Sequence, residues 1–168
     1  MKTILLNIIL FSTVLFTLNS CSSDSSEETA DVTAALIVKN YTYNDEEIET
    51  MKLINDYRVS VGLNALEKVN HISYKSEEHN YYMIEKKEPS HDGFLDRSNN
   101  IMKSLGASTV GENIAYNYNS AQGVVTAWLN SDSHKKNIEG NYTHFGISIR
   151  QDPSTGKKYY TNIFARMD

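Results

Sequence analysis

The sequence predicts an α+β domain in which three or four helices cover the faces of a small antiparallel sheet. Two observations predict it. Apolar residues recur at helical spacing three times before residue 130, and from Phe145 onward the spacing changes to the alternation typical of strands. The turn-forming segment 152–156 then reverses the chain into segment 159–165, so the last third of the sequence predicts a β-hairpin.

The first helix is predicted from its start signal. Asn44 can cap it and Glu47 can reach back to complete a capping box, with acidic residues in the first turn, where the helix dipole favours them. Gly62 ends the pattern. The apolar residues at helical spacing, which we expect to face the core, are Ile48, Met51, Ile54, Tyr57 and Val61.

The remaining elements are predicted in the same way. A second helix spans residues 71–86 and ends before Pro89. Its inward residues are expected to be Ile72, His79, Tyr82 and Met83. A short helix lies within the loop at 96–105, an extended piece covers 114–118, and a third helix runs from its cap Ser120 to about Ser131.

The amino terminus predicts export. Lys2 precedes an apolar run that ends at residue 18, which is too short for a membrane-spanning helix and typical of a signal peptide over residues 1–20. The only cysteine, Cys21, follows it at the place where bacterial lipoproteins carry their lipid; the alternative is an ordinary signal peptide beside a spare thiol. We expect an acidic, serine-rich tether at 21–40 and one domain at 41–168.

The charge pattern excludes a class of partner. The formal net charge is -5, and removal of residues 1–20 takes away one positive charge and no negative charge. The lysines and arginines are scattered among a larger number of acids, whereas polyanion binding needs a clustered basic surface. We therefore expect no nucleic-acid partner.

The most informative segment, 111–145, carries the candidate site. Glu112 stands between a glycine and an apolar segment, so its carboxylate is expected at the edge of the core, where a charge needs a partner. His134 is a candidate partner, and His91 supplies a second imidazole. Two histidines and one carboxylate can ligate a divalent metal such as zinc or relay protons.

An ordered set of landmarks from residue 48 to residue 164 carries a family resemblance. They are Asn55, Arg58, Gly62, Leu63, Leu66, His79, Met83, Ser90-His91, Gly111-Glu112-Asn113-Ile114-Ala115, Trp128, Ser131, His134, Asn137-Ile138, Gly146-Ile147 and Tyr159-Tyr160. In this order the chain resembles a bacterial member of the CAP superfamily, the cysteine-rich secretory, antigen 5 and pathogenesis-related 1 proteins (SCP-like). The resemblance implies that family's three-layer α-β-α sandwich.

The resemblance also implies a central cleft with two histidines and two acids, which binds a divalent cation in several members. By motif, His91, Glu112 and His134 match three of these positions. At the fourth, where many eukaryotic members have glutamate, this chain has Ser131 followed by Asp132. Either Asp132 turns inward, a water fills the place, or the metal interpretation fails.

Each candidate residue has a purely structural alternative. Glu112 can accept backbone hydrogen bonds from its turn and have no chemical role. His91 can belong to a surface turn, and His134 can pack on Trp128. His79, on an apolar helix face, is expected to be a core histidine, and His144 is left out of the site.

Three functions fit these residues. We favour an extracytoplasmic, lipid-anchored binding module, monomeric, whose cleft binds a divalent cation or a small apolar or lipid ligand, at the outer membrane or cell surface of a bacterium. The alternatives are a metal-dependent, peptidase-like hydrolase using the same cleft, and a cell-surface adhesin. No familiar nucleophile motif is present. The tyrosines that can supply amphipathic contacts are Tyr116, Tyr118, Tyr142, Tyr159 and Tyr160.

Overall fold

Helix α2, Asp45–Ser60, begins with the predicted capping box. In the computed structural model, which describes residues 37–168, the Asn44 side chain accepts the Glu47 N–H, and the Glu47 carboxylate accepts the Asn44 N–H. Two of the backbone N–H groups at the start of the helix that lack an intrahelical partner are thereby satisfied. The helix ends before Gly62, whose φ of +82° lies in the left-handed region that favours glycine.

The buried face of α2 differs from the predicted one. Met51 and Ile54 are buried as expected, but Ile48 and Val61 are about half exposed, at 51% and 48%. The helix instead buries two charged residues, Glu47 and Arg58. Buried charges need partners. The guanidinium of Arg58 donates to four backbone carbonyls, those of Asn64, Ile138, Gly140 and Tyr142. Polar anchors therefore set the orientation of this helix.

The other predicted helices are present. Helix α3 buries Ile72, His79 and Met83 as expected, whereas Tyr82 is only half-buried. Helix α4 begins two residues earlier than predicted, and Ser120 caps α5 by accepting the Gly123 N–H. The bounds are α3 Asn70–Lys86, α4 Phe94–Leu105, α5 Ala121–Leu129 and α6 Asp132–Ile138.

The sheet has the order β1-β3-β4-β2. The predicted hairpin is formed by β3 and β4, and β2, which was expected only at 114–118, is longer and pairs with β4 in antiparallel fashion. The two-residue β1 pairs in parallel with β3, so the sheet is antiparallel except at this edge. The bounds are β1 Glu67–Lys68, β2 Thr109–Tyr116, β3 His144–Gln151 and β4 Lys158–Arg166.

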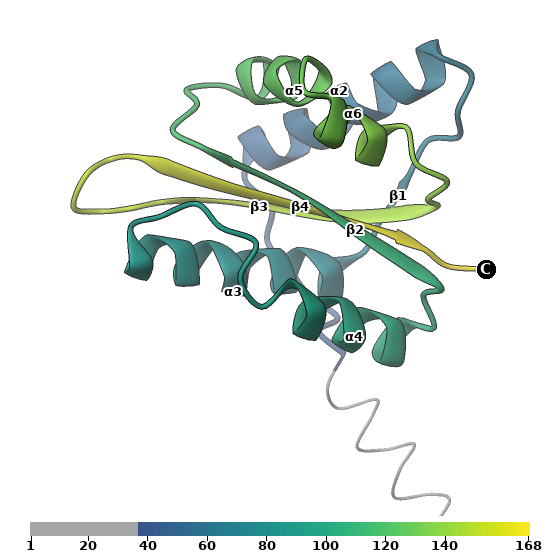
Figure 1. Cartoon of the computed structure of the whole chain (residues 1–168), viewed down its shortest axis with the longest axis horizontal. Coiled ribbons are helices and arrows are strands. Elements are labelled where there is room, and N and C mark those ends of the chain that lie inside the picture. Colours follow the sequence, from purple (N-terminus) through teal and green to yellow (C-terminus); the bar gives the residue numbers. More distant parts are fainter. Residues whose placement is uncertain (1–36) are drawn as a thin grey trace, which may run out of the picture.

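Helices cover both faces of this sheet (Figure 1). Helices α2, α5 and α6 lie on one face and α3 and α4 on the other, which confirms the α-β-α sandwich. One core cluster, around Trp128 and Phe145, packs between the sheet and the first layer; the second, around Ile72 and Ile163, packs against the other face. Gly146 lets α3 approach closely, because a Cβ there would lie 2.3 Å from the Ser73 nitrogen.

Strand β2 is an edge strand, and side chains from the first helical layer cover part of its edge. The Trp128 indole N–H donates to the Ile114 carbonyl at 2.9 Å, and the Asn137 amide donates to the Glu112 carbonyl at 3.0 Å. Because these two carbonyls already accept a side-chain donor, they do not invite an added strand. The same bonds fix α5 and α6 beside β2.

Several predictions concern residues outside the described range. The signal peptide 1–20, Cys21 and most of the tether 21–40 lie there, so they remain predictions. Within residues 37–168, none of the helices has the length and apolar character needed to cross a membrane.

Candidate functional site

The alternation of strand β2 separates two neighbouring residues of the candidate site. Glu112 points toward the α3–α4 layer, where it contacts Arg97 of α4. Asn113 points to the opposite face, where its amide donates to the backbone carbonyl of His134. Successive side chains of a strand lie on opposite faces of the sheet, so one short motif contacts both layers.

The Glu112 carboxylate is bound by two side chains. The Arg97 guanidinium donates twice, from Nε to Oε2 and from Nη2 to Oε1, each at 2.9 Å, and the His91 Nδ1 lies 2.8 Å from Oε1. The Glu112 side chain is 1% exposed. Burial raises the pKa of Glu112, but the hydrogen bonds from His91 and Arg97 and the Arg97 charge outweigh it, so its pKa lies below the ordinary value.

These contacts correct two expectations. His134 was a candidate partner of Glu112, and it is not the partner, because β2 turns the carboxylate toward the other layer, where His91 and Arg97 bind it. The structural alternative, a carboxylate held by the backbone of its own turn, is also wrong, since its donors are side chains from distant segments. Arg97 was not identified from the sequence.

His91 lies in the loop between α3 and α4, with 53% of its side chain exposed. His79 of α3 holds this loop through a 2.7 Å hydrogen bond from its Nε2 to the Ser90 carbonyl. A carbonyl only accepts, so His79 Nε2 carries a proton. Burial and then the Arg97 charge lower the pKa of His79, and its buried Nδ1 has no partner among residues 37–168. His79 was expected to be a satisfied core histidine; it is buried in the core, but only Nε2 is bonded, and that bond holds the His91 loop.

On the other side of His91, the loop is held by hydrogen bonds to Asp92. The Tyr82 hydroxyl donates to the Asp92 carboxylate at 2.9 Å, and Arg97 Nη1 donates to the Asp92 carbonyl at 2.7 Å. Both residues flanking His91 are thus bonded to helices α3 and α4. The backbone that carries this ring is held on both sides.

His134, in α6, is held differently. Its Nδ1 lies 2.8 Å from the hydroxyl of Ser131, the residue just before α6. Burial, and to a lesser extent the electrostatic effect of the neighbouring His91 ring, lower the pKa of His134. The ring is therefore neutral at neutral pH, which is the form that binds metals.

A cleft of about 470 Å³ joins the two rings. His91 and His134 both line it, and no protein group among residues 37–168 bonds to the Nε2 of either ring. Ser131 adds a hydroxyl at the same end. The apolar and aromatic lining consists of Pro89, Ile114, Ala115, Tyr116, Tyr118, Ala127 and Trp128. The cleft thus combines a polar imidazole end with an apolar wall.

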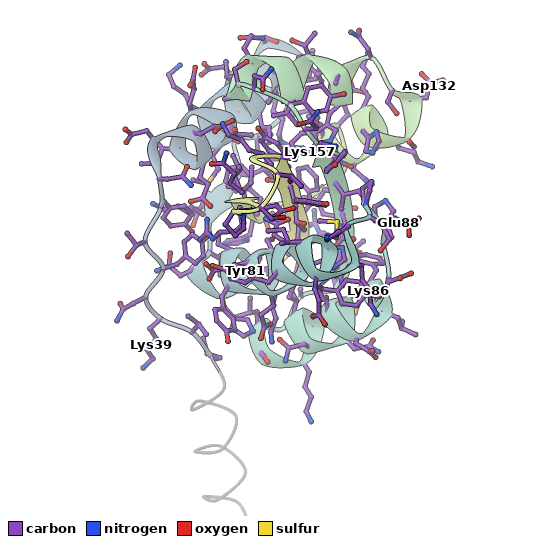
Figure 2. All side chains as sticks on the ribbon, turned by 90° about the vertical axis from the view of Figure 1, so that its left-hand side faces the viewer. Lys39, Tyr81, Lys86, Glu88, Asp132 and Lys157 are labelled. Atoms are coloured by element: carbon purple, nitrogen blue, oxygen red, sulfur yellow. The ribbon has the colours of Figure 1, made fainter. Side chains whose placement is uncertain are left out.

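Asp132 does not enter this cleft. It is exposed in the first turn of α6 and lines a different hollow, together with Lys135 and Arg166. Figure 2 shows it at the outer edge of the layer formed by α5 and α6. The option that Asp132 turns inward to replace the missing acid is therefore wrong. His144, which was left out of the site, lies near Glu67 and does not line the cleft.

Metal binding by His91, Glu112 and His134 remains a prediction. Both imidazoles line the cleft, while Glu112 lies behind His91 with both carboxylate oxygens already bonded. In the part of the chain that the structure describes, no three histidine, cysteine, aspartate or glutamate side chains form a group that could hold a metal ion. The arrangement that a metal ion could use is therefore two cleft histidines, one of which is bonded to a carboxylate behind it.

Comparison with known sequences identifies relatives in Bacillus subtilis. The chain is 42% identical over 57 residues to the uncharacterized membrane protein YlbC and 46% identical over 57 residues to the uncharacterized protein YkwD. These matches cover 33% and 32% of this chain and 15% and 22% of the relatives, so the chain spans only a minor part of either protein.

Solved structures share the fold. An outer surface protein of Borrelia burgdorferi superposes with a TM-score of 0.66 at 20% identity over 78% of this chain and all of its own. A cysteine-rich secretory protein of Staphylococcus aureus gives 0.63 at 20% identity over 73% of this chain and 38% of its own. An extracellular SCP-domain protein of Bacillus anthracis gives 0.63 at 22% identity over 76% and 45%.

A protein-family model matches most of the residues that the structure describes. The cysteine-rich secretory protein family (CAP) matches residues 51–164, from the middle of α2 to the last strand. This segment includes both cleft histidines, the buried carboxylate and its arginine. The chain therefore belongs to the cysteine-rich secretory protein (CAP) family.

Proposed function

We propose that this protein is an exported CAP-domain binding module whose cleft binds a divalent cation such as zinc through Nε2 of His91 and His134. The observation that carries the proposal is the hydrogen bond that Nδ1 of each imidazole ring makes within the protein. Nδ1 of His91 is bonded to a carboxylate and Nδ1 of His134 to a hydroxyl, and both rings line one cleft. Metal-binding histidines have this second bond, because it fixes the ring and leaves the other nitrogen for the metal.

The donor set fits a weakly held, accessible ion. Two imidazoles suit zinc, and the remaining coordination positions are left for water or a ligand. Glu112 supports the site from behind His91 rather than as a ligand, since Arg97 and His91 bind its oxygens. The adjacent apolar wall, with Tyr116 and Tyr118, accommodates a small apolar or lipid ligand that also contacts the imidazole end.

Zinc calorimetry on the protein without its signal peptide tests the proposal. We expect binding of a single equivalent with release of protons at mildly acidic pH, and loss of this heat in the variants His91→Ala and His134→Ala. His144→Ala is the matched control, because this histidine lies outside the cleft. Absence of binding by the unaltered protein, or equal loss in the His144 variant, contradicts the proposal.

Attachment to the cell envelope is the second part of the proposal. It is supported by the apolar amino-terminal run followed by Cys21, and by the fold shared with an outer surface protein and an extracellular protein. We expect Cys21→Ser to move the protein from the membrane fraction to the soluble fraction. Unchanged fractionation in that variant refutes lipid anchoring and leaves the cleft proposal intact.

Hydrolysis is the second candidate function, and one observation favours it. An ionised Glu112 bonded to Nδ1 of His91 is the arrangement that orients a histidine as a general base. His91 would take a proton from water as the water oxygen attacks a carbonyl in the cleft, and it would return that proton to the departing alcohol or amine as the ester or amide bond breaks. Cleavage of ester or peptide substrates that is lost in His91→Ala supports this function; no turnover by the unaltered protein excludes it.

A further inference from the structure

Arg97 contacts two of the groups that hold His91, the Glu112 carboxylate and the backbone carbonyl of Asp92. Its side chain is 12% exposed, and it extends from α4 to β2 and back to the loop before α4. Nε and Nη2 bind the two oxygens of Glu112, and Nη1 donates to the Asp92 carbonyl. One guanidinium therefore joins the carboxylate to the backbone next to the histidine.

The hydrogen-bond chemistry assigns the proton on the His91 ring. The Glu112 carboxylate, paired with Arg97, is ionised and can only accept. The bond between His91 and Glu112 Oε1 then requires the proton on Nδ1 of the imidazole. In the neutral ring the lone pair is left on Nε2, the nitrogen that has no protein partner among the described residues.

The three contacts of Arg97 depend on the shape of its side chain. A planar guanidinium presents its donors in a fixed fork, which matches both carboxylate oxygens and still leaves Nη1 for a third acceptor. A lysine in this position keeps the positive charge but presents a single compact ammonium group. Replacement by lysine therefore separates the effect of geometry from the effect of charge.

We propose that Arg97 is a positioning residue for the cleft, which fixes the orientation of Glu112 so that His91 keeps its proton on Nδ1 and presents the Nε2 lone pair to the ligand. This inference rests on the proposed role of the cleft as the binding site. It extends that role because Arg97 itself does not line the cleft.

The tautomer of His91 can be observed directly. In ¹⁵N-labelled protein without metal, at a mildly alkaline pH, long-range ¹H–¹⁵N spectra distinguish a protonated from an unprotonated ring nitrogen. We expect Nδ1 protonated and Nε2 unprotonated in the unaltered protein. In Arg97→Lys and Arg97→Gln we expect a shift toward the Nε2–H form. An Nε2–H form of His91 in the unaltered protein overturns the proposal without any variant.

Arg150→Gln is the matched control. Arg150 also pairs with a buried carboxylate, that of Glu47, but it lies away from the cleft. We expect this variant to lose stability and to keep the His91 spectrum unchanged. If the Arg97 variants are folded, as judged by circular dichroism, and keep the original His91 spectrum, the positioning role is refuted.

Zinc titration separates this inference from the proposed function. Removal of an outer partner of a metal ligand typically weakens metal binding about 10- to 100-fold, and we expect this range for Arg97→Lys. An unchanged zinc Kd in Arg97→Lys overturns the link between Arg97 and the cleft. If the unaltered protein binds no zinc, the metal proposal fails, while the His91 spectrum still decides the role of Arg97.

Discussion

Two buried carboxylates, Glu47 and Glu112, have the same kind of ion pair and serve different purposes. Glu47 pairs with Arg150 at 2.7 Å and Glu112 pairs with Arg97 at 2.9 Å, and both glutamate side chains are buried. Their other partners differ. Glu47 also accepts from the Tyr41 hydroxyl and from two backbone N–H groups, whereas the additional partner of Glu112 is the half-exposed ring of His91.

The difference teaches what makes a buried ion pair functional here. The donors around Glu47 belong to β3 and to the segment before α2, and none of them lines the cleft. The cluster therefore joins these two segments to α2. At Glu112 one donor carries a second nitrogen that lies open to the cleft. Both pairs are buried, and only the pair at Glu112 is connected through a histidine to the cleft.

The largest expected effect is the loss of stability when either carboxylate is neutralised. Breaking a buried pair by removing one partner costs about 3–5 kcal/mol, so Glu47→Gln and Glu112→Gln should lower the free energy of unfolding by similar amounts. Urea unfolding measures this loss. Zinc calorimetry on the folded variants should show a defect only in Glu112→Gln, and an equal defect in Glu47→Gln would break the comparison.

A smaller effect is expected from the third partner of each pair. Tyr41→Phe removes a hydroxyl that donates to Glu47 and accepts from Arg150, which should cost about 1–3 kcal/mol of stability without changing zinc binding. His91→Ala removes a half-exposed ring and should cost about 1 kcal/mol, with loss of zinc binding. Loss of zinc binding in Tyr41→Phe with unchanged zinc binding in His91→Ala would contradict the assignment of the binding role to the Glu112 cluster.

The smallest effect is a dependence of stability on pH. His79, which holds the His91 loop, has a pKa lowered from its ordinary 6.5, chiefly by burial, so the unfolded chain protonates first as the pH falls. Stability is then fully present above about pH 6.5 and declines as the pH falls below it. Buried His71 contributes with the same sign.

Urea unfolding between pH 7 and pH 5 checks this sign. We expect His79→Gln to reduce the slope of unfolding free energy against pH, whereas Tyr41→Phe, at the other cluster, should leave the slope unchanged. A slope that persists unaltered in His79→Gln would show that this histidine does not titrate differently in the folded protein.

The elements that the sequence predicted correctly have local signals. Asn44 and Glu47 form the capping box within four residues, and the segment 152–156 forms its turn through Asp152, whose pKa is lowered to about 2, first by the Thr155 and Ser154 hydroxyls. Such features depend on neighbours in the chain. They therefore predict helix starts and turns without knowledge of the tertiary structure.

The errors concern which side of an element faces which layer. Helical spacing indicated Ile48 and Val61 as core residues, but the burial of Glu47 and Arg58 with distant partners turned α2 another way. The partner of Glu112 was wrong for a related reason. Strand alternation could have shown that Glu112 and its neighbour face opposite layers, but not which layer each one faces.

Arg97 carried no such signal. It lies in an amphipathic helix with no motif around it, and the role proposed for it rests on two contacts outside that helix, with Glu112 on β2 and with the carbonyl of Asp92. An arginine of this kind can be recognised only when the position of the carboxylate that it binds is known from the fold. The two histidines were found because their flanking residues form recognisable motifs.

The side chains that close the edge of β2 also bear on the solubility of this protein. Trp128 and Asn137 occupy carbonyls that a second molecule could otherwise use to extend the sheet, and Trp128 is at the same time a wall of the cleft. The Trp128 indole therefore contributes both to the cover of this strand edge and to the shape of the cleft. A substitution that widens the pocket at this position also exposes a surface on which copies can aggregate.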